Sequence, residues 1–192
     1  MIAIIKYNSG NVTSIKNAIN RLGGECIITD DKDKINHAEK VILPGVGNAA
    51  PAMKYLRDKG LDEIILSLQQ PVLGICLGLQ LLCSDSEEGK TSCLHIFNTS
   101  VKKFPSIKKV PHMGWNNFIS VNGSLFKNVL AENNVYFVHS YYAEICSQTI
   151  AICNYIQPFS AALQKDNFYA TQFHPEKSAD VGETILKNFL EL

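Results

Sequence analysis

Short apolar runs alternate with helix-like stretches through the first half of the chain, and this alternation restricts the possible folds strongly. The apolar runs are rich in β-branched residues and predict strands at residues 2–6, 26–29, 41–43 and 72–75. Helices are expected between them at residues 13–22, at 49–68 with a break near Gly60, and at 77–83. Parallel strands need crossover connections, which are usually helices, so the pattern predicts a parallel, doubly wound sheet with helices on both faces.

The second half of the chain has a different pattern. Aromatic-rich, strand-like segments joined by turn residues occur at residues 115–121, 135–145, 149–156 and 160–173. They predict an antiparallel or mixed extension of the sheet, and residues 180–190 predict a closing amphipathic helix. Without an internal repeat or a linker, the expectation is one α/β domain over residues 1–192, with a mostly parallel sheet and an antiparallel extension.

Composition excludes several classes of function. Lysine plus arginine and aspartate plus glutamate number 18 each, which gives no electrostatic argument for nucleic acid or an acidic membrane as a partner. The apolar run at residues 2–5 is too short for a signal peptide or a membrane span. Six cysteines without a C-x-x-C pair predict reduced thiols in the cytoplasm, and neither a disulfide framework nor a zinc site.

Cys76 stands between two glycines, at the predicted junction of a strand and a helix. The spacing of Gly74, Cys76 and Gly78 is typical of an elbow that raises a nucleophile above the carboxyl edge of a sheet. Amides at a helix N-terminus favour a thiolate, and the amide of Leu77 can face an oxyanion. The alternative is a buried cysteine in a β–α turn, with glycines for close packing.

His174 is the histidine best placed to serve such a thiol. A predicted strand runs directly into His174, Pro175 and Glu176, and the carboxylate two residues on can accept from the imidazole and orient it. The alternative is a histidine at a strand end beside a surface glutamate. The other histidines have different expected settings, namely a solvated surface for His37, unassigned connections for His95 and His112, and core or site lining for His139.

The two motifs together, GICLGLQ at residues 74–80 and QFHPEKS at 172–178, resemble the class I (triad-type) glutamine amidotransferases. This resemblance implies that Cys76, His174 and Glu176 form a catalytic triad. Stretches at residues 7–14, 43–47, 111–116 and 136–142 are similar to the glutaminase subunits of imidazole glycerol phosphate synthase.

The narrower resemblance implies a function. Such a subunit hydrolyses L-glutamine through a cysteine thioester, with no metal and no cofactor. It passes the ammonia to a separate (β/α)8-barrel cyclase in a heterodimer of histidine biosynthesis. Departures from the family pattern at residues 92–100 and 49–50 leave one alternative open, a related glutaminase that supplies ammonia for amidination of a nucleotide sugar. A cysteine peptidase and a non-catalytic scaffold are the remaining, more distant alternatives.

The resemblance also implies roles for residues around the triad. Amides of Gly45, Val46 and Leu77 would form the oxyanion hole, and in related glutaminases this loop is thought to need a rearrangement first. Gln80 and Glu88 would bind the amino-acid end of glutamine, although Glu87 and Glu88 also fit a solvated turn.

Some motif residues have no role in the hydrolysis itself, so we expect them at the partner interface. Met113 and Trp115, which we place in a loop, are apolar groups suited to an interface, with a local core cluster as the alternative. The predicted interface residues are Asn8, Gly10, Asn11, Met113, Trp115, Tyr136 and Lys177.

Overall fold

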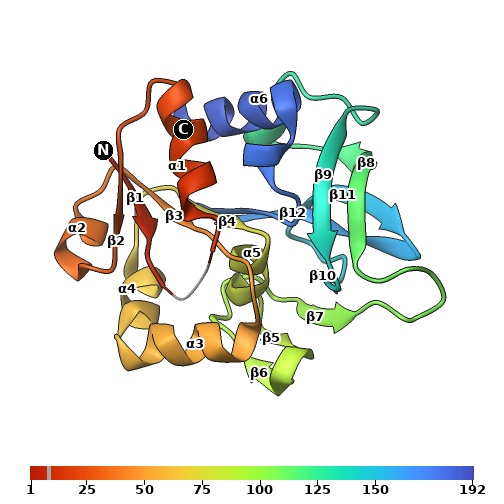
Figure 1. Ribbon diagram of the computed structural model, residues 1–192, viewed down its shortest axis with the longest axis horizontal. Coiled ribbons are helices and arrows are strands. Elements are labelled where there is room, and N and C mark those ends of the chain that lie inside the picture. Colours follow the sequence, from red (N-terminus) through yellow and green to blue (C-terminus); the bar gives the residue numbers. More distant parts are fainter. Residues whose placement is uncertain (8–9) are drawn as a thin grey trace.

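The computed structural model describes residues 1–7 and 10–192, and its strands are linked through continuous pairing (Figure 1). The strands are β1 (Ile2–Ile5), β2 (Cys26–Thr29), β3 (Lys40–Leu43), β4 (Val72–Ile75), β5 (Asp85–Ser86), β6 (Thr91–Ser92), β7 (Ser100–Lys103), β8 (His112–Val121), β9 (Asn134–His139), β10 (Tyr141–Ala143), β11 (Thr149–Tyr155), β12 (Gln157–Lys165) and β13 (Phe168–Thr171). The helices are α1 (Val12–Arg21), α2 (Lys32–Asn36), α3 (Ala49–Asp58), α4 (Leu61–Ser67), α5 (Leu77–Leu82) and α6 (Ala179–Leu190), with short 3₁₀ turns η1 (Glu88–Lys90), η2 (Ser124–Phe126) and η3 (Pro175–Lys177).

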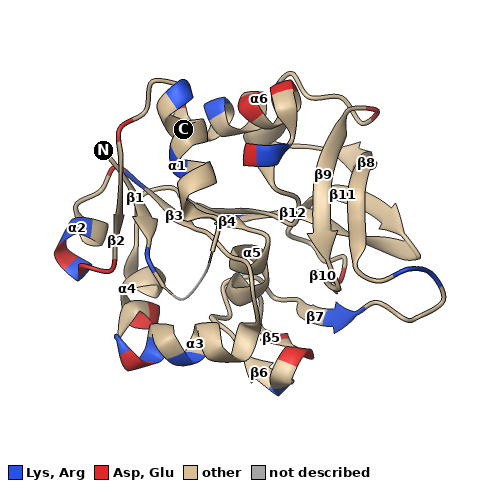
Figure 2. Cartoon of the chain, in the orientation of Figure 1, with Lys and Arg blue, Asp and Glu red and all other residues tan. Residues whose placement is uncertain are grey.

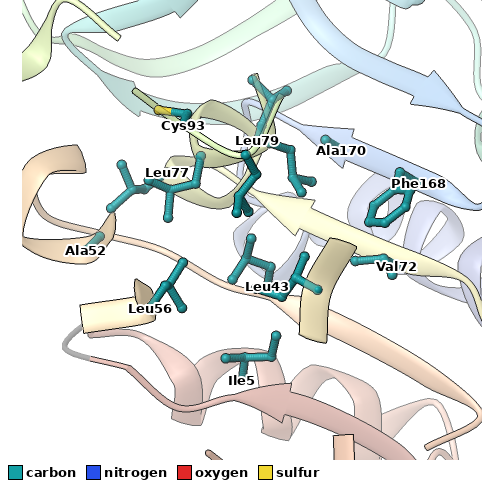
Figure 3. Packing of buried hydrophobic residues seen from close by; sticks show 14 of the residues in the cluster. Ile5, Leu43, Ala52, Leu56, Val72, Leu77, Leu79, Cys93, Phe168 and Ala170 are labelled. Atoms are coloured by element: carbon teal, nitrogen blue, oxygen red, sulfur yellow. The ribbon is translucent and has the colours of Figure 1, made fainter. Parts of the chain in front are cut away.

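The parallel part of the sheet runs in the order β2-β1-β3-β4-β13, and each neighbouring pair in it is parallel. Successive residues of β1 point to opposite faces. Ala3 and Ile5 join a core with α3, α4 and α5, whereas Ile2 and Ile4 join a second core with α1 and α6. Figure 3 shows the first core, with Leu43 packed near Leu56. The predicted doubly wound arrangement is confirmed, since both faces of these strands are covered by helices.

The antiparallel extension begins at β12, which pairs antiparallel with β13, β10 and β11. β8 pairs with β11 on one side and with β9 on the other, and these strands stand at one end of the molecule (Figure 1). The expected mixed extension in the second half is therefore confirmed.

One local expectation needs correction. Met113 and Trp115 lie in strand β8 and not in a loop, because they pair in register with Val138 and Tyr136 of β9. His37 is exposed, as expected, and directly follows the short helix α2, which begins where the side chain of Asp31 accepts from the amides of the first turn. The break near Gly60 is confirmed, since Gly60 separates α3 from α4 with a φ of 60°.

Charged side chains are spread over the surface helices with both signs (Figure 2). The connection between β7 and β8 is locally basic, because it carries Lys108 and Lys109. Within the described ranges, no helix is long and apolar enough to cross a membrane.

Candidate active site

Cys76 follows the last residue of β4 and precedes the first residue of α5, at the carboxyl edge of the parallel strands. Its φ of 55° and ψ of −105° lie in a region that side-chain-bearing residues rarely adopt, so the backbone at this turn is strained. The amide of Cys76 donates to the carbonyl of Thr171 on β13 at 2.7 Å, which fixes the elbow to the neighbouring strand.

Glycine is needed at the two positions around Cys76 for different steric reasons. A Cβ on Gly78 would lie 2.0 Å from the carbonyl oxygen of Leu43, so only glycine lets α5 approach β3 this closely. A Cβ on Gly74 would lie 2.9 Å from the backbone of Gly78 and 2.7 Å from Leu82. Crowding between the two positions therefore explains the glycine at position 74, whereas the obstacle at Gly78 is the neighbouring strand.

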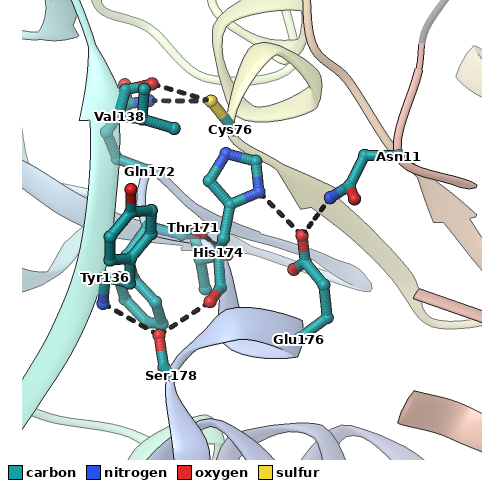
Figure 4. Close-up of polar contacts among 10 residues, drawn as sticks. Asn11, Cys76, Tyr136, Val138, Thr171, Gln172, His174, Glu176 and Ser178 are labelled. Carbon is teal, nitrogen blue, oxygen red and sulfur yellow. Dashed lines mark hydrogen bonds and ion pairs between the residues drawn. The ribbon is translucent and has the colours of Figure 1, made fainter. Parts of the chain in front are cut away.

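His174 and Glu176 are brought to Cys76 by the strand beside it. β13 runs parallel to β4 with Thr171 opposite Ile75, so both chains leave the sheet at the same edge. His174 Nδ1 lies 2.8 Å from Glu176 Oε1, and the exposed fractions of the two side chains are 1% and 0%. Because the carboxylate accepts a hydrogen bond from Nδ1–H, Nε2 is left to point toward the Cys76 sulfur (Figure 4).

The electrostatics of this group favour a charged imidazole. Burial alone disfavours the imidazolium, but the adjacent Cys76 and Glu176 outweigh it and raise the pKa of His174 to about 10. His174 Nε2 and Glu176 Oε2 are the buried side-chain atoms without a hydrogen-bond partner in residues 1–7 and 10–192. Nε2 is therefore placed to give a proton to a leaving group on the carbon atom that Cys76 attacks.

Asn11 has a contact that sequence reasoning missed. We expected Asn11 at the partner interface, but its side-chain amide donates to Glu176 Oε1, the oxygen that also accepts from His174 (Figure 4). Asn11 itself has a left-handed backbone conformation at the start of α1, with a φ of 71°, and this conformation directs its side chain toward Glu176. The sequence signal was an asparagine directly before a helix, which normally indicates only a helix cap.

A pocket of about 330 Å³ opens beside the cysteine, which is large enough for an amino acid. Cys76 is 6% exposed and is one of the residues that line this pocket. The lining residues include Val46, Gly47, Asn48, Cys76, Leu77, Gln80, Glu88, Pro111, Val138, His139, Ser140 and Tyr141.

The two predicted substrate contacts both line this pocket, but each also has a structural partner. The side-chain nitrogen of Gln80 donates to the carbonyl of Tyr141 and to Gln172, both at 3.0 Å, which leaves its carbonyl oxygen for a ligand. Glu88 Oε2 accepts from the amide of Ala49 at 2.7 Å and so caps α3. Burial raises the pKa of Glu88 although this hydrogen bond opposes the shift, so Glu88 is not part of a fully solvated turn.

The predicted oxyanion hole is not assembled in this conformation. The amide of Leu77 donates to the carbonyl of Gly45 at 3.4 Å. In a trans peptide the carbonyl and the following amide point in opposite directions, so the Val46 amide points away from that of Leu77. A Cβ on Gly45 would lie 2.6 Å from Leu77, so glycine at this position permits the close approach.

The predicted interface residues other than Asn11 lie on the outer face of β8 and β9, near the triad, or outside the described residues. Met113 and Trp115 are 60% and 56% exposed on the outer face of β8, so the alternative of a local core cluster is wrong. Trp115 packs edge-to-face on Tyr136 with ring centroids 5.9 Å apart. Gly10 and Lys177 are exposed near the triad, and Asn8 lies outside the described residues.

Two buried histidines, His139 in the pocket lining and His112 beside it, are hydrogen-bonded to each other. His139 Nδ1 lies 2.7 Å from the carbonyl oxygen of Tyr141, and His139 Nε2 lies 2.9 Å from His112 Nδ1. A carbonyl only accepts, so His139 donates from Nδ1 and accepts from His112. Burial lowers the pKa of His139 to about 3 and that of His112 to about 4, so both rings are neutral near pH 7.

We expect acid to destabilise the fold through His139. The unfolded ring titrates near pH 6.5 but the folded ring near 3, so stability is complete above about pH 6.5 and falls as the pH falls toward 3. Between pH 7.5 and 5 this ring should account for about 1 to 2 kcal/mol of the loss. The variant His139→Gln keeps a donor and an acceptor, and in urea unfolding it should lose less stability over this interval. An identical pH dependence of the two proteins would contradict the assignment.

Comparisons with known proteins extend the geometric description. The family described as glutamine amidotransferase class-I matches residues 3–192. The chain belongs to the class-I glutamine amidotransferases. This amidotransferase is 55% identical to a Bacteroides thetaiotaomicron protein named imidazole glycerol phosphate synthase subunit HisH, over 100% of this chain and 99% of that protein. It is 46% identical to the protein of the same name from Pasteurella multocida, over 99% and 97% of the two chains.

Solved structures of low sequence identity share the fold of this amidotransferase. A crystal structure titled glutamine amidotransferase has a TM-score of 0.77 at 16% identity and covers 100% of this chain and 98% of that one. A glutamine amidotransferase from Thermotoga maritima has a TM-score of 0.66 at 18% identity, with 99% and 82% covered. The predicted fold class is therefore confirmed.

Proposed function

We propose that this protein is the glutaminase subunit of imidazole glycerol phosphate synthase. It hydrolyses glutamine and passes the ammonia to a (β/α)8-barrel cyclase subunit, which makes imidazole glycerol phosphate and AICAR in histidine biosynthesis. The observation that carries the proposal is the arrangement of Cys76, His174 and Glu176 at one pocket, in a chain 55% identical over its full length to a protein of that name. The cytoplasm is the proposed compartment, in keeping with six free thiols.

The geometry supports a thioester mechanism. Cys76 Sγ, as the thiolate, attacks the side-chain amide carbon of glutamine, and the amide bond breaks as His174 gives its Nε2 proton to the departing ammonia. Glu176 stabilises the imidazolium before this transfer. Water then attacks the γ-glutamyl thioester, His174 takes the proton of that water, and glutamate leaves as the thiolate is restored. The amide of Leu77 can hold the oxyanion once the carbonyl of Gly45 has moved from it.

The chemistry of ammonia supports the proposal that a partner docks on this protein. In neutral water ammonia is mostly protonated and no longer nucleophilic, so the acceptor site must receive it by a shielded route. The outer face of β8 and β9 offers an interface, because it exposes Met113 and Trp115 beside Val138, which lines the pocket. Amidination of a nucleotide sugar is not favoured, since relatives at 55% and 56% identity have the synthase name.

The proposal is tested by measuring glutamine hydrolysis with and without a purified barrel cyclase and its ribonucleotide substrate. We expect the rate to rise only when that cyclase is present, because it docks over the pocket. In Trp115→Ala the cyclase concentration for half-maximal stimulation should rise about tenfold or more, since a half-exposed tryptophan is a typical interface anchor.

The matched control is Leu66→Ala, which removes a 49% exposed apolar side chain on α4. It should leave stimulation unchanged. If the cyclase does not stimulate the wild type, or if both variants weaken stimulation equally, the proposed partner or its docking face is wrong.

A further inference from the structure

Gln172 is a fully buried polar residue beside Cys76 and is not among the residues that line the pocket. Its side chain is 0% exposed, and its Nε2 lies 3.7 Å from Cys76 Sγ, within hydrogen-bonding range for sulfur (Figure 4). It stands between Thr171, which binds the amide of Cys76, and the segment that leads to His174. The catalytic steps above do not use it, and a buried amide of this kind needs an explanation.

The orientation of the Gln172 amide is fixed by its neighbours. The carbonyl of Tyr141 only accepts, so the side chain of Gln80 must turn its nitrogen toward it. The same nitrogen donates to Gln172 Oε1 at 3.0 Å. Gln172 is therefore held with its oxygen toward Gln80 and its N–H toward the sulfur of Cys76.

The sulfur consequently faces two groups that favour different protonation states. The carbonyl of Val138 lies 3.9 Å from Sγ and can only accept, so it favours the thiol. The N–H of Gln172 can only donate, so it favours the thiolate, and donors to an ionised acceptor form the stronger hydrogen bonds. After the proton has moved to His174, the Gln172 contact is the one that gains strength.

We propose that Gln172 is a positioning residue for the nucleophile, which donates to Cys76 Sγ and holds the thiolate opposite His174. It acts when the thiolate forms and again when the thioester breaks, since the same sulfur leaves as a thiolate in that step. The inference rests on the proposed glutaminase function for its catalytic meaning, but the contact itself can be tested on the thiol alone.

The test is the rate at which iodoacetamide alkylates Cys76 at pH 7, followed by mass spectrometry of the peptide. In Gln172→Glu the acid can still accept from Gln80 but presents no N–H to the sulfur, so the rate should fall about tenfold or more. The pH at which alkylation reaches half its maximal rate should move upward. Cys26, a partly exposed thiol on β2, is an internal reference whose rate should not change.

Two further variants separate this effect from a general loss of structure. Gln172→Met removes the donor without adding charge and should also slow alkylation. Asn188→Asp makes the same kind of amide-to-acid change at a buried site on α6, where the amide donates to Leu125 and Lys127, and should leave the Cys76 rate unchanged. If Cys76 reacts in both Gln172 variants within twofold of the wild-type rate, relative to Cys26, the inference is overturned.

Glutamine hydrolysis gives a second, distinguishable readout. In Gln172→Glu kcat should fall while KM changes little, because Gln172 contacts the sulfur and is not among the residues that line the pocket. A wild type that hydrolyses no glutamine would overturn the proposed function but leave the alkylation result standing. A variant with a raised KM and unchanged kcat would assign Gln172 to substrate binding and overturn the positioning role.

Discussion

Cys76→Ala should abolish glutamine hydrolysis, with a fall in kcat of at least about 10⁴-fold, because no other described residue that lines the pocket carries a thiol to form the thioester. Synthesis from added ammonium salt by the assembled enzyme should persist, since the cyclase would receive ammonia from solution. The measurement is glutamate release beside product formation, with glutamine or with ammonia as the nitrogen source.

Cys26→Ala is the control for this change, because it removes a thiol on β2, away from the pocket. It should retain the wild-type rate with both nitrogen sources. Glutamine-dependent synthesis at the normal rate in Cys76→Ala would show that the protein acts as a scaffold and not as a glutaminase.

Glu176→Gln should lower kcat about 10² to 10³-fold, because it removes the negative charge that stabilises the His174 imidazolium. In the wild type the pKa of His174 is raised to about 10, so the imidazolium persists at neutral pH and is lost as the pH rises through that value. In the variant the same loss should occur at a lower pH, where the favourable charge no longer opposes the effect of burial.

The ring titration can be followed by NMR of ¹⁵N-labelled histidine beside the steady-state assay. Glu183→Gln is the matched control, since it removes an exposed carboxylate of α6 that pairs with Arg21 at 3.2 Å. It should change neither measurement. A His174 titration that is the same in Glu176→Gln and the wild type would mean that the carboxylate does not control the imidazole.

The strands and the nucleophile were predictable because they depend on short-range patterns. Buried parallel strands need uninterrupted apolar runs, and the elbow needs glycines at fixed spacing, so β4, Cys76 and the break at Gly60 could be located from local residues alone. β13 and His174 could be located from local sequence for the same reason. Their closeness to Cys76 depends on the parallel pairing of two strands that are distant in sequence.

Features that depend on long-range contacts were not predictable. The side chain of Asn11 reaches Glu176 only because α1 packs beside η3, and the sequence around Asn11 does not indicate this partner. Trp115 was expected in a loop, whereas pairing with β9, which is distant in sequence, makes the segment a strand. Gln172 could be seen in its motif, but nothing local indicates which atom its amide would face.

The contact between the amide of Leu77 and the carbonyl of Gly45 has a consequence for nitrogen economy. A copy of this chain that is synthesised in excess of its partner would keep one oxyanion donor blocked, and so would spare the cellular supply of glutamine. On the proposed function, rotation of this single peptide group on cyclase binding would couple glutamine hydrolysis to the presence of an acceptor for the ammonia.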